Sequence, residues 1–362
     1  MSSLDKASIE KAIGAVIDPN SEASITKSNT IEALVIDGDK VSVKMAFGYP
    51  AKSVHAELTE SIQNAIASMD GVSSASVEID TEISSHAVQE GTKPLDGVKN
   101  IIAVASGKGG VGKSTVSANL ALALSAEGAT VGILDADIYG PSQPRMFGLS
   151  GQPTTDGNSL QPMVSYKIQT MSIGYLIEED TPMIWRGPMV TQALEQLLRD
   201  TKWKDLDYLI IDLPPGTGDT QLTLAQKVPV SGAIIVTTPQ DIALIDARKA
   251  VKMFEKVEIP ILGVVENMST HICSNCGHEE HIFGEGGGQR MADDYDISFL
   301  GDIPLDGKIR ENMDNGKPTV VSEPDSAVTL KYKEIARKAA ARLANRKKDY
   351  SAAFPNIVIQ QN

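Results

Sequence analysis

The stretch Ser106-Gly107-Lys108-Gly109-Gly110-Val111-Gly112-Lys113-Ser114-Thr115 decides the fold of this chain. An apolar run from Ile101 to Ala105 precedes it and is typical of a buried parallel strand. The residues from Val116 to Ala126 have the pattern of a helix. Strand, glycine-rich loop and helix form the context in which the pattern G-x-x-x-x-G-K-[ST] binds phosphate. The sequence therefore predicts an α/β fold: a P-loop NTPase domain with a mostly parallel sheet flanked by helices.

Each part of this loop has an expected role. The glycines let the backbone wrap around an anion with its N–H groups pointing inward, and the helix N-terminus adds its positive dipole end. We expect Lys113 to reach the β- and γ-phosphates and Ser114 to hold Mg²⁺. The alternative is a glycine-rich turn without a ligand, which the completely filled motif disfavours. The predicted nucleotide-binding residues of the loop are Gly107, Lys108, Gly109, Gly110, Val111, Gly112, Lys113, Ser114 and Thr115.

Three aspartates follow other predicted strands. Asp135 and Asp137 come directly after the strand predicted at 129–134, and Asp212 ends the apolar run that begins at Leu206. Ligands of open parallel sheets bind at the carboxyl ends of the strands. We therefore expect Asp212 to act as a Walker B residue in the Mg²⁺ shell, and Asp135 or Asp137 to orient the attacking water. The alternative for Asp135 and Asp137 is a pair of turn residues. The segment 214–219, which follows Asp212, is predicted to be switch II.

Composition limits the classes of function. The chain has 362 residues and a net charge of −14, and this acidic balance argues against non-specific nucleic-acid binding. No apolar run approaches the ~20 residues that span a bilayer, and the N-terminus lacks the features of a signal peptide. These features predict a cytoplasmic protein that binds neither membrane nor nucleic acid. The 2 cysteines are close neighbours, so a disulfide framework is not expected.

The predicted domain organisation has four parts. Residues 1–80 contain helix and strand patterns with an Asp37-Gly38-Asp39 hairpin turn and are expected to form a small α/β domain. Residues 81–99 are polar, contain Gly91, Pro94 and Gly97, and are interpreted as an exposed linker. Residues 100–347 form the P-loop domain, in which a long amphipathic helix is predicted at 324–346, and 348–362 form a C-terminal tail.

The motif Cys273-Ser274-Asn275-Cys276 offers two thiolates at the spacing of one metal centre. A [4Fe–4S] cluster needs four thiolates, which two chains facing each other across a two-fold axis would supply. Three alternatives remain open. Cys273 and Cys276 could bind zinc together with His278 and His281, they could form a thioredoxin-type redox pair, or they could be inert.

The early lysine, Lys108, gives the loop a resemblance to the deviant Walker A motif of the MinD, ParA and nitrogenase-iron-protein group. Together with the segments 185–188, 207–219, 237–241 and 266–269 and with Cys273-x-x-Cys276, the chain resembles the Mrp/ApbC family of iron–sulfur cluster carriers. The resemblance covers residues from about 100 to 316. Residues 1–80 resemble the small domain of iron–sulfur assembly proteins, although Gly48-Tyr49-Pro50 lacks the cysteine found in some relatives.

This resemblance implies a homodimer that binds and slowly hydrolyses ATP, holds a labile [4Fe–4S] cluster on Cys273 and Cys276, and passes it to apo iron–sulfur proteins, with assembly scaffolds as further partners. It also implies that Lys108 reaches the partner's nucleotide and that Asn267 reads the adenine edge. Arg186 is expected to contact phosphate or the partner subunit, or to be an ordinary surface residue. A positioning ATPase and a zinc-stabilised scaffold are the competing interpretations.

Overall fold

The structure is a computed structural model that describes residues 4–89, 92–157, 159–177, 187–273 and 275–348. The small N-terminal domain has a three-stranded sheet in the order β3-β4-β5, in which β3 and β4 form an antiparallel hairpin and β4 and β5 are parallel. Both long helices pack on this sheet through buried isoleucines, Ile9 and Ile13 from one helix and Ile62 and Ile66 from the other. The elements are α1 (Lys6–Gly14), β1 (Ile17–Asp18), β2 (Ala23–Ser24), β3 (Asn29–Asp37), β4 (Lys40–Phe47), α2 (His55–Ala67) and β5 (Ser74–Thr81).

The larger domain is built on an eight-stranded sheet in the order β10-β11-β7-β12-β6-β13-β14-β17. Every pairing in this sheet is parallel except that of β10 with β11. The predicted mostly parallel sheet is therefore confirmed. The strands are β6 (Val98–Ala105), β7 (Val131–Asp135), β10 (Met163–Ser165), β11 (Ile168–Ser172), β12 (Leu206–Asp212), β13 (Gly232–Thr237), β14 (Ile261–Asn267) and β17 (Phe299–Ile303).

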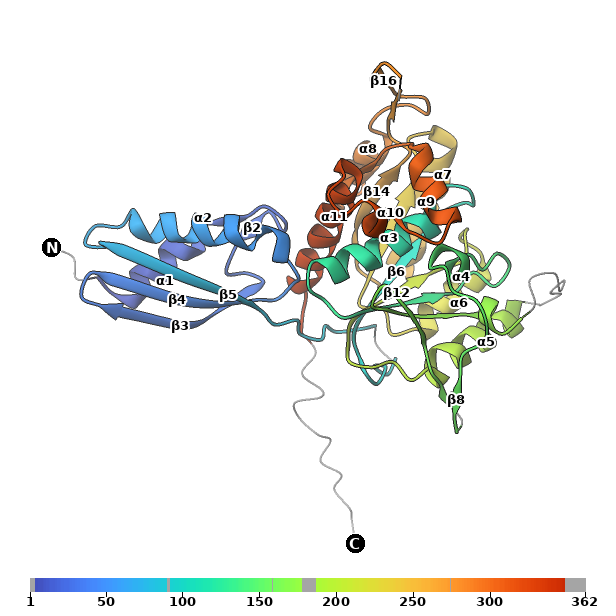
Figure 1. Ribbon diagram of the computed structural model, residues 1–362, viewed down its shortest axis with the longest axis horizontal. Coiled ribbons are helices and arrows are strands. Elements are labelled where there is room, and N and C mark those ends of the chain that lie inside the picture. Colours follow the sequence, from blue (N-terminus) through green and yellow to red (C-terminus); the bar gives the residue numbers. More distant parts are fainter. Residues whose placement is uncertain (1–3, 90–91, 158, 178–186, 274, 349–362) are drawn as a thin grey trace, which may run out of the picture.

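Helices cover both faces of this sheet (Figure 1). One face packs against α3 (Lys113–Ala126), α9 (Gly307–Asp314), α10 (Thr319–Ser322) and α11 (Ala327–Ala344). The other face packs against α5 (Gly187–Asp200), α6 (Asp219–Lys227), α7 (Asp241–Lys256) and α8 (Gly287–Asp294). The remaining elements are α4 (Gln143–Met146), the hairpin of β8 (Thr155–Asp156) and β9 (Ser159–Leu160), and the hairpin of β15 (His271–Ile272) and β16 (Glu279–Glu280), together with the 3₁₀ helices η1 (Lys52–Val54) and η2 (Ile173–Tyr175).

The segment between the two domains is not uniformly exposed, contrary to the sequence-based interpretation. Ile83 is 7% exposed and His86 is 3% exposed. The side-chain amide of Gln89 donates to the carbonyl groups of Ala225 and Val228, at the end of α6. Polar composition did not reveal these contacts, because a few side chains tie an otherwise polar segment to the larger domain.

A buried charge cluster joins the two domains. Glu127, which follows the last residue of α3, is completely buried and accepts hydrogen bonds from the backbone N–H and hydroxyl of Ser53. Arg337 of α11 donates to the same carboxylate at 3.1 Å and to the Ser53 hydroxyl at 2.9 Å. Arg337 also reaches Asn20 at 3.3 Å. The small domain is therefore docked on the C-terminal end of the helix that begins at the P-loop, beside α11 (Figure 1).

Candidate functional site

The P-loop connects the carboxyl end of β6 to the first residue of α3. The helix begins at Lys113, three residues before the sequence-based expectation, directly after Gly112 with a φ of 80°. A Cβ at Gly107 would overlap the backbone of Asp246 in α7, and a Cβ at Gly112 would overlap the side-chain amide of Asn267. Gly110 has a φ of 82° and open space around its Cβ position. The two outer glycines therefore fix the loop against the protein, while its middle is free to receive an anion.

Lys113 and Asp212 form a buried ion pair beneath this loop. Their Nζ and Oδ1 atoms lie 2.5 Å apart, and the two side chains are 5% and 0% exposed. The hydroxyl of Ser117, one turn along α3, donates to the same carboxylate oxygen at 2.9 Å. The paired strands β12 and β7 place Asp212 directly beside Asp135. The predicted lysine and Walker B aspartate are therefore brought together.

Asp135 and Asp137 join this cluster. Burial, and then the neighbouring carboxylate of Asp212, raises the pKa of Asp135 to about 7. Burial also raises the pKa of Asp137, while the nearby Lys113 opposes that shift. The backbone N–H of Asp137 donates to Asp135, as does the hydroxyl of Ser172 at the end of β11. Three carboxylates and one ammonium group thus share one site at the carboxyl edge of the sheet.

Gln143, Ser117 and Ser172 were missed by the sequence analysis. Gln143 begins α4, and its side-chain amide donates to both Asp212 and the backbone carbonyl of Ser114. No sequence signal marks Gln143 or Ser172, because only the tertiary fold brings them to the cluster. Ser117 had a weak signal, since it lies four residues after Lys113 and hence on the same face of the predicted helix.

The segment predicted as switch II contacts the base of the P-loop. The backbone N–H of Gly216, at a φ of 105°, donates to the carbonyl of Ser106 at 2.9 Å. The Gln221 side chain of α6 donates to the carbonyl of Pro215 at 2.6 Å. This backbone therefore lies within hydrogen-bond distance of the loop that is predicted to hold the nucleotide.

Two other predicted residues border the loop. Lys108 is half-buried, and its ammonium forms no ion pair with any residue in the described part of the chain. The Asn267 amide donates to the carbonyl of Val111 at 2.9 Å and is 6% exposed. In this structure the Asn267 side chain therefore supports the P-loop backbone.

The residues present fit a magnesium–nucleotide complex. The loop offers open backbone at Gly109 and Gly110, a lysine and the Ser114 hydroxyl, with carboxylates next to them. The Oε1 atom of Gln143 is buried without a hydrogen-bond partner among the described residues. A buried acceptor of this kind is stabilised when a hydrogen-bond donor, such as one that accompanies a bound ligand, comes within reach.

The cysteine pair lies on a hairpin that leaves the same edge of the sheet. The hairpin of β15 and β16 follows β14 and projects from the larger domain (Figure 1). Cys276 is exposed and Cys273 is half-buried, and neither forms a disulfide. Backbone N–H groups of Cys276 and Asn275, together with the Cys276 thiol, lower the pKa of Cys273. The turn is held by hydrogen bonds from Cys273 N–H to the His278 carbonyl and from Gly277 N–H to the Cys273 carbonyl.

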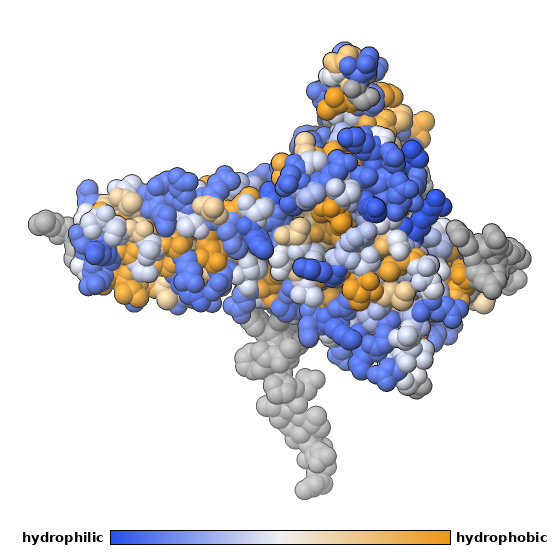
Figure 2. Space-filling model, in the orientation of Figure 1, coloured by the Kyte–Doolittle hydropathy of each residue, from blue (hydrophilic) through white to orange (hydrophobic). Residues whose placement is uncertain are grey.

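Isolated apolar side chains accompany these cysteines. Ile272 is 56% exposed and Ile282 is 49% exposed, and Figure 2 shows apolar surface on the projecting hairpin. Among the described residues of this hairpin, the His, Cys, Asp and Glu side chains form no group of three or more that could hold a metal ion. The four-ligand zinc arrangement of Cys273, Cys276, His278 and His281 is therefore not assembled in this structure.

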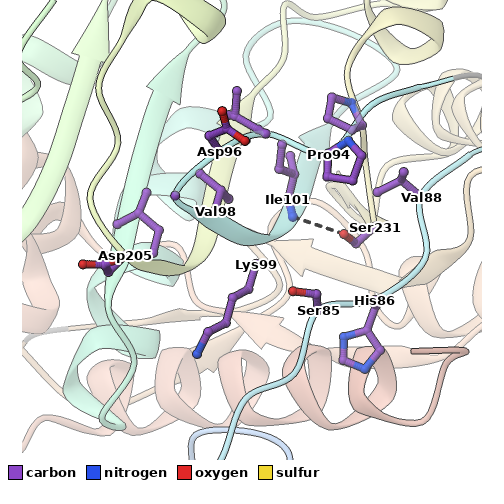
Figure 3. A pocket seen from close by; sticks show the side chains of 14 residues that line it. Ser85, His86, Val88, Pro94, Asp96, Val98, Lys99, Ile101, Asp205 and Ser231 are labelled. Atoms are coloured by element: carbon purple, nitrogen blue, oxygen red, sulfur yellow. Dashed lines mark hydrogen bonds between the residues drawn. The ribbon is translucent and has the colours of Figure 1, made fainter. Parts of the chain in front are cut away.

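A separate cavity of about 540 Å³ lies at the opposite end of the sheet. Figure 3 shows that its lining comes from the interdomain segment, including Ser85 and His86, and from the amino end of β6. The N–H of Ile101 donates to the Ser231 hydroxyl at 3.2 Å across its wall. Ligands of parallel sheets bind at the carboxyl ends, so this cavity is distinct from the candidate nucleotide site.

Two expectations concern other parts of the chain. Arg186 lies outside the described residues. Among the helices that the structure describes, none combines the length and the apolar character needed to cross a membrane.

Comparisons with known proteins agree with this geometry. A family model described as NUBPL iron-transfer P-loop NTPase matches residues 97–340, and one described as iron–sulfur cluster assembly protein matches residues 6–79. An iron–sulfur cluster carrier protein of Pseudomonas fragi is 60% identical over 278 residues, which are 76% of this chain and 97% of that protein. The iron–sulfur cluster carrier protein of Escherichia coli strain K12 is 50% identical over 327 residues, covering 90% of this chain and 89% of that protein.

A solved structure shows the same fold. The nucleotide-binding protein from Archaeoglobus fulgidus, in complex with ADP, matches with a TM-score of 0.56 and 39% sequence identity, over 65% of this chain and 92% of that chain. The resemblance inferred from the sequence is confirmed, because the matching family model spans more than half of the residues. The chain belongs to the family of NUBPL iron-transfer P-loop NTPases.

Proposed function

We propose that this protein is an ATP-hydrolysing carrier that binds a labile [4Fe–4S] cluster at a homodimer interface and transfers it to apo-proteins. One observation carries this proposal. A P-loop with its lysine and carboxylates, and a hairpin with the half-buried Cys273 and the exposed Cys276, emerge from the same carboxyl edge of one sheet. The cluster is the cargo of the reaction, and ATP is the substrate of the hydrolytic site.

The nucleotide site assigns a role to each predicted residue. The backbone from Gly107 to Thr115 surrounds the phosphates, Lys113 neutralises their charge, and Ser114 and Asp212 hold Mg²⁺. Asp137 or Asp135 orients the attacking water. Asp135 is completely buried whereas Asp137 is half-buried, so Asp137 is the better candidate for contact with the attacking water.

The surface beside the P-loop supports a second copy of the chain as the partner. Ile242 and Ile245 are 71% and 51% exposed on α7, whose backbone at Asp246 touches Gly107. Lys108 lies on the same loop without a counter-ion among the described residues. A dimer that covers these isoleucines places Lys108 near the partner's nucleotide, where it stabilises charge that develops in the transition state.

The cysteine hairpin suits reversible cluster binding. Backbone N–H donors favour the thiolate form of Cys273, and thiolate is the form that binds iron. One chain supplies two thiolates, so a dimer completes the four that a [4Fe–4S] cluster requires. The hairpin follows β14, and β14 is separated from β6, the strand before the P-loop, only by β13. In the proposed dimer, a change in the arrangement of the two chains on hydrolysis therefore alters the distance between their cysteine pairs.

The remaining parts of the proposal concern location and partners. We assign the protein to the cytoplasm and expect apo iron–sulfur proteins and assembly scaffolds as partners, with no membrane or nucleic acid among them. The proposed division is a docking module at 1–80, a linker at 81–99, the ATPase at 100–347 and a tail at 348–362.

Anaerobic reconstitution with iron and sulfide tests the proposal. We expect about two irons and two sulfides per chain, which corresponds to one [4Fe–4S] cluster per dimer. Replacing Cys273 and Cys276 by Ala should abolish this uptake and leave nucleotide binding unchanged. One tightly held zinc per chain with no uptake of iron would contradict the carrier function and favour a scaffold. Loss of nucleotide binding in the same variant would mean that the cysteines are structural.

A further inference from the structure

Gln143 occupies a central position in the nucleotide site. Its side chain is completely buried. Its backbone N–H donates to Asp135 Oδ2 at 3.1 Å, and its Nε2 donates to Asp212 Oδ2 at 2.9 Å and to the carbonyl of Ser114 at 3.1 Å. One residue therefore joins the P-loop to the carboxyl ends of two neighbouring strands.

These contacts fix the orientation of the amide. Turning it over would place Oε1 against two acceptors, the Asp212 carboxylate and the Ser114 carbonyl, which repel another oxygen. In the observed orientation both N–H groups of Nε2 have acceptors. Oε1 is left buried with no partner among the described residues. Leaving a buried acceptor unsatisfied costs about 1–3 kcal/mol, so this arrangement favours the arrival of a donor.

The partners of Asp212 indicate which donor arrives. In this structure Asp212 Oδ1 accepts from Lys113 and Ser117, and Asp212 Oδ2 accepts from Gln143. In the proposed nucleotide site, Lys113 would turn from Asp212 toward the phosphates, and Asp212 would then be one of the residues that hold Mg²⁺. The hydrogen bonds from Ser117 and Gln143 to Asp212 do not involve Lys113, so they can hold the carboxylate in place when the lysine moves away.

We propose that Gln143 is a positioning residue for magnesium: its Nε2 keeps Asp212 aimed at the ion, and its Oε1 accepts a hydrogen bond from the ion's hydration shell. This inference rests on the proposed nucleotide site. It predicts that Gln143 affects how strongly Mg²⁺ increases the affinity for nucleotide, and has little effect on the affinity without Mg²⁺.

The test is a titration of the full-length protein with a fluorescent, non-hydrolysable ATP analogue, in Mg²⁺ and in EDTA. The ratio of the two dissociation constants measures the coupling. We expect Gln143→Met, which has nearly the same volume and lacks the amide, to reduce this ratio by about tenfold, as expected for the loss of a hydrogen bond to a charged group. Affinity in EDTA should change by less than about twofold.

A matched control is available in Gln169→Met. Gln169 also makes two hydrogen bonds through its amide, to the backbone of Lys204, near the opposite end of β11 from Ser172. The control should retain the wild-type ratio. Gln143→Asn provides a second variant if the Met variant does not fold, because it keeps a buried amide that is one methylene too short to span Asp212 and Ser114.

The outcomes separate this inference from the proposed function. A wild-type coupling ratio in Gln143→Met or Gln143→Asn would overturn the assignment. An equal loss of affinity in Mg²⁺ and in EDTA would also overturn it, because it would show a general structural role. Failure of the wild-type protein itself to bind the analogue would instead remove the proposed nucleotide function on which the inference depends.

Discussion

Lys113 Nζ lies 2.5 Å from Asp212 Oδ1 in a site from which both side chains have almost no contact with solvent. Burial of two charges is tolerated here because Ser117 and Gln143 also donate to Asp212. Lys113 and Asp212 are therefore expected to affect both the free energy of unfolding and the proposed hydrolysis of ATP. In the proposed reaction Lys113 must move from this carboxylate to the phosphates. The Lys113–Asp212 ion pair therefore corresponds to the protein without bound ATP.

Replacing Lys113 by Ala should abolish ATP hydrolysis and also destabilise the protein. The change leaves a buried carboxylate without its cation, which typically costs about 3–5 kcal/mol of unfolding free energy. Phosphate release and urea unfolding measure the two effects. Adding Asp212→Asn should recover part of the stability and none of the hydrolysis. Undiminished hydrolysis in the purified Lys113→Ala protein would refute the assignment of the loop.

Replacing Lys108 by Ala should leave stability within about 0.5 kcal/mol of wild type, since its ammonium has no ion-pair partner among the described residues. Hydrolysis should fall strongly, because the proposed role of Lys108 is to stabilise the partner's transition state. Nucleotide binding by the single chain should persist.

A mixing experiment distinguishes action across the dimer from action within one chain. Lys108→Ala and Lys113→Ala proteins are each inactive, but a mixed dimer contains one site with both lysines if Lys108 acts on the partner. An equimolar, fully exchanged mixture should recover roughly a quarter of wild-type hydrolysis, because about half of the dimers are mixed. An inactive mixture that contains mixed dimers would show that Lys108 acts within its own chain.

Replacing Arg337 by Ala should lower the unfolding free energy by about 3 kcal/mol, because it leaves the buried Glu127 without its cation. Cleavage by added protease in the interdomain segment should accelerate as the small domain separates. Arg342→Ala is the matched control on the same helix. Arg342 pairs with Glu22, whose side chain is 69% exposed, so its loss should cost less than about 1 kcal/mol. Equal effects of the two substitutions would contradict this account.

His86 and His55 contribute stability that should be lost as the pH is lowered through the range of histidine titration, whereas Asp135, whose pKa is raised to about 7, contributes in the opposite direction. Burial lowers the pKa of His86 below its usual value near 6.5, and burial does the same to His55. At these two histidines the unfolded chain therefore binds more protons than the folded chain, so their contribution to the unfolding free energy decreases with decreasing pH.

His86→Gln retains a donor for the Asn100 side chain and removes one of the two titrating groups. Urea unfolding at about pH 7.5 and 5.5 should therefore show that this variant loses less unfolding free energy on acidification than the wild type does. A further decrease in this loss is expected when His55→Gln is added. A variant whose loss matches that of the wild type would remove His86 from this explanation.

The sequence predicted those features that depend on contiguous residues. The loop from Gly107 to Thr115 was identified because its spacing, strand and helix lie together in the chain. Asp212 was found for the same reason, as the end of an apolar strand. The parallel sheet then placed these segments at one edge without further information.

Features that depend on tertiary contacts were not predicted. Gln143 is one polar residue after a turn until the fold brings it between Asp212 and Ser114. The Glu127–Arg337 pair joins residues 210 positions apart in the chain. His86 lies in a polar segment, and only the packing of that segment against the larger domain reveals that it is buried.

The position of Glu127 has a mechanical consequence. α3 is one uninterrupted helix of 14 residues, with the phosphate-binding lysine at its first position and Glu127 just after its last. At 1.5 Å per residue this rod is about 21 Å long, so a tilt of about 5° at the P-loop displaces its far end by roughly 2 Å. The small domain is hydrogen-bonded to that end of α3 through Ser53, so a tilt of α3 on binding of phosphate would move the small domain with it.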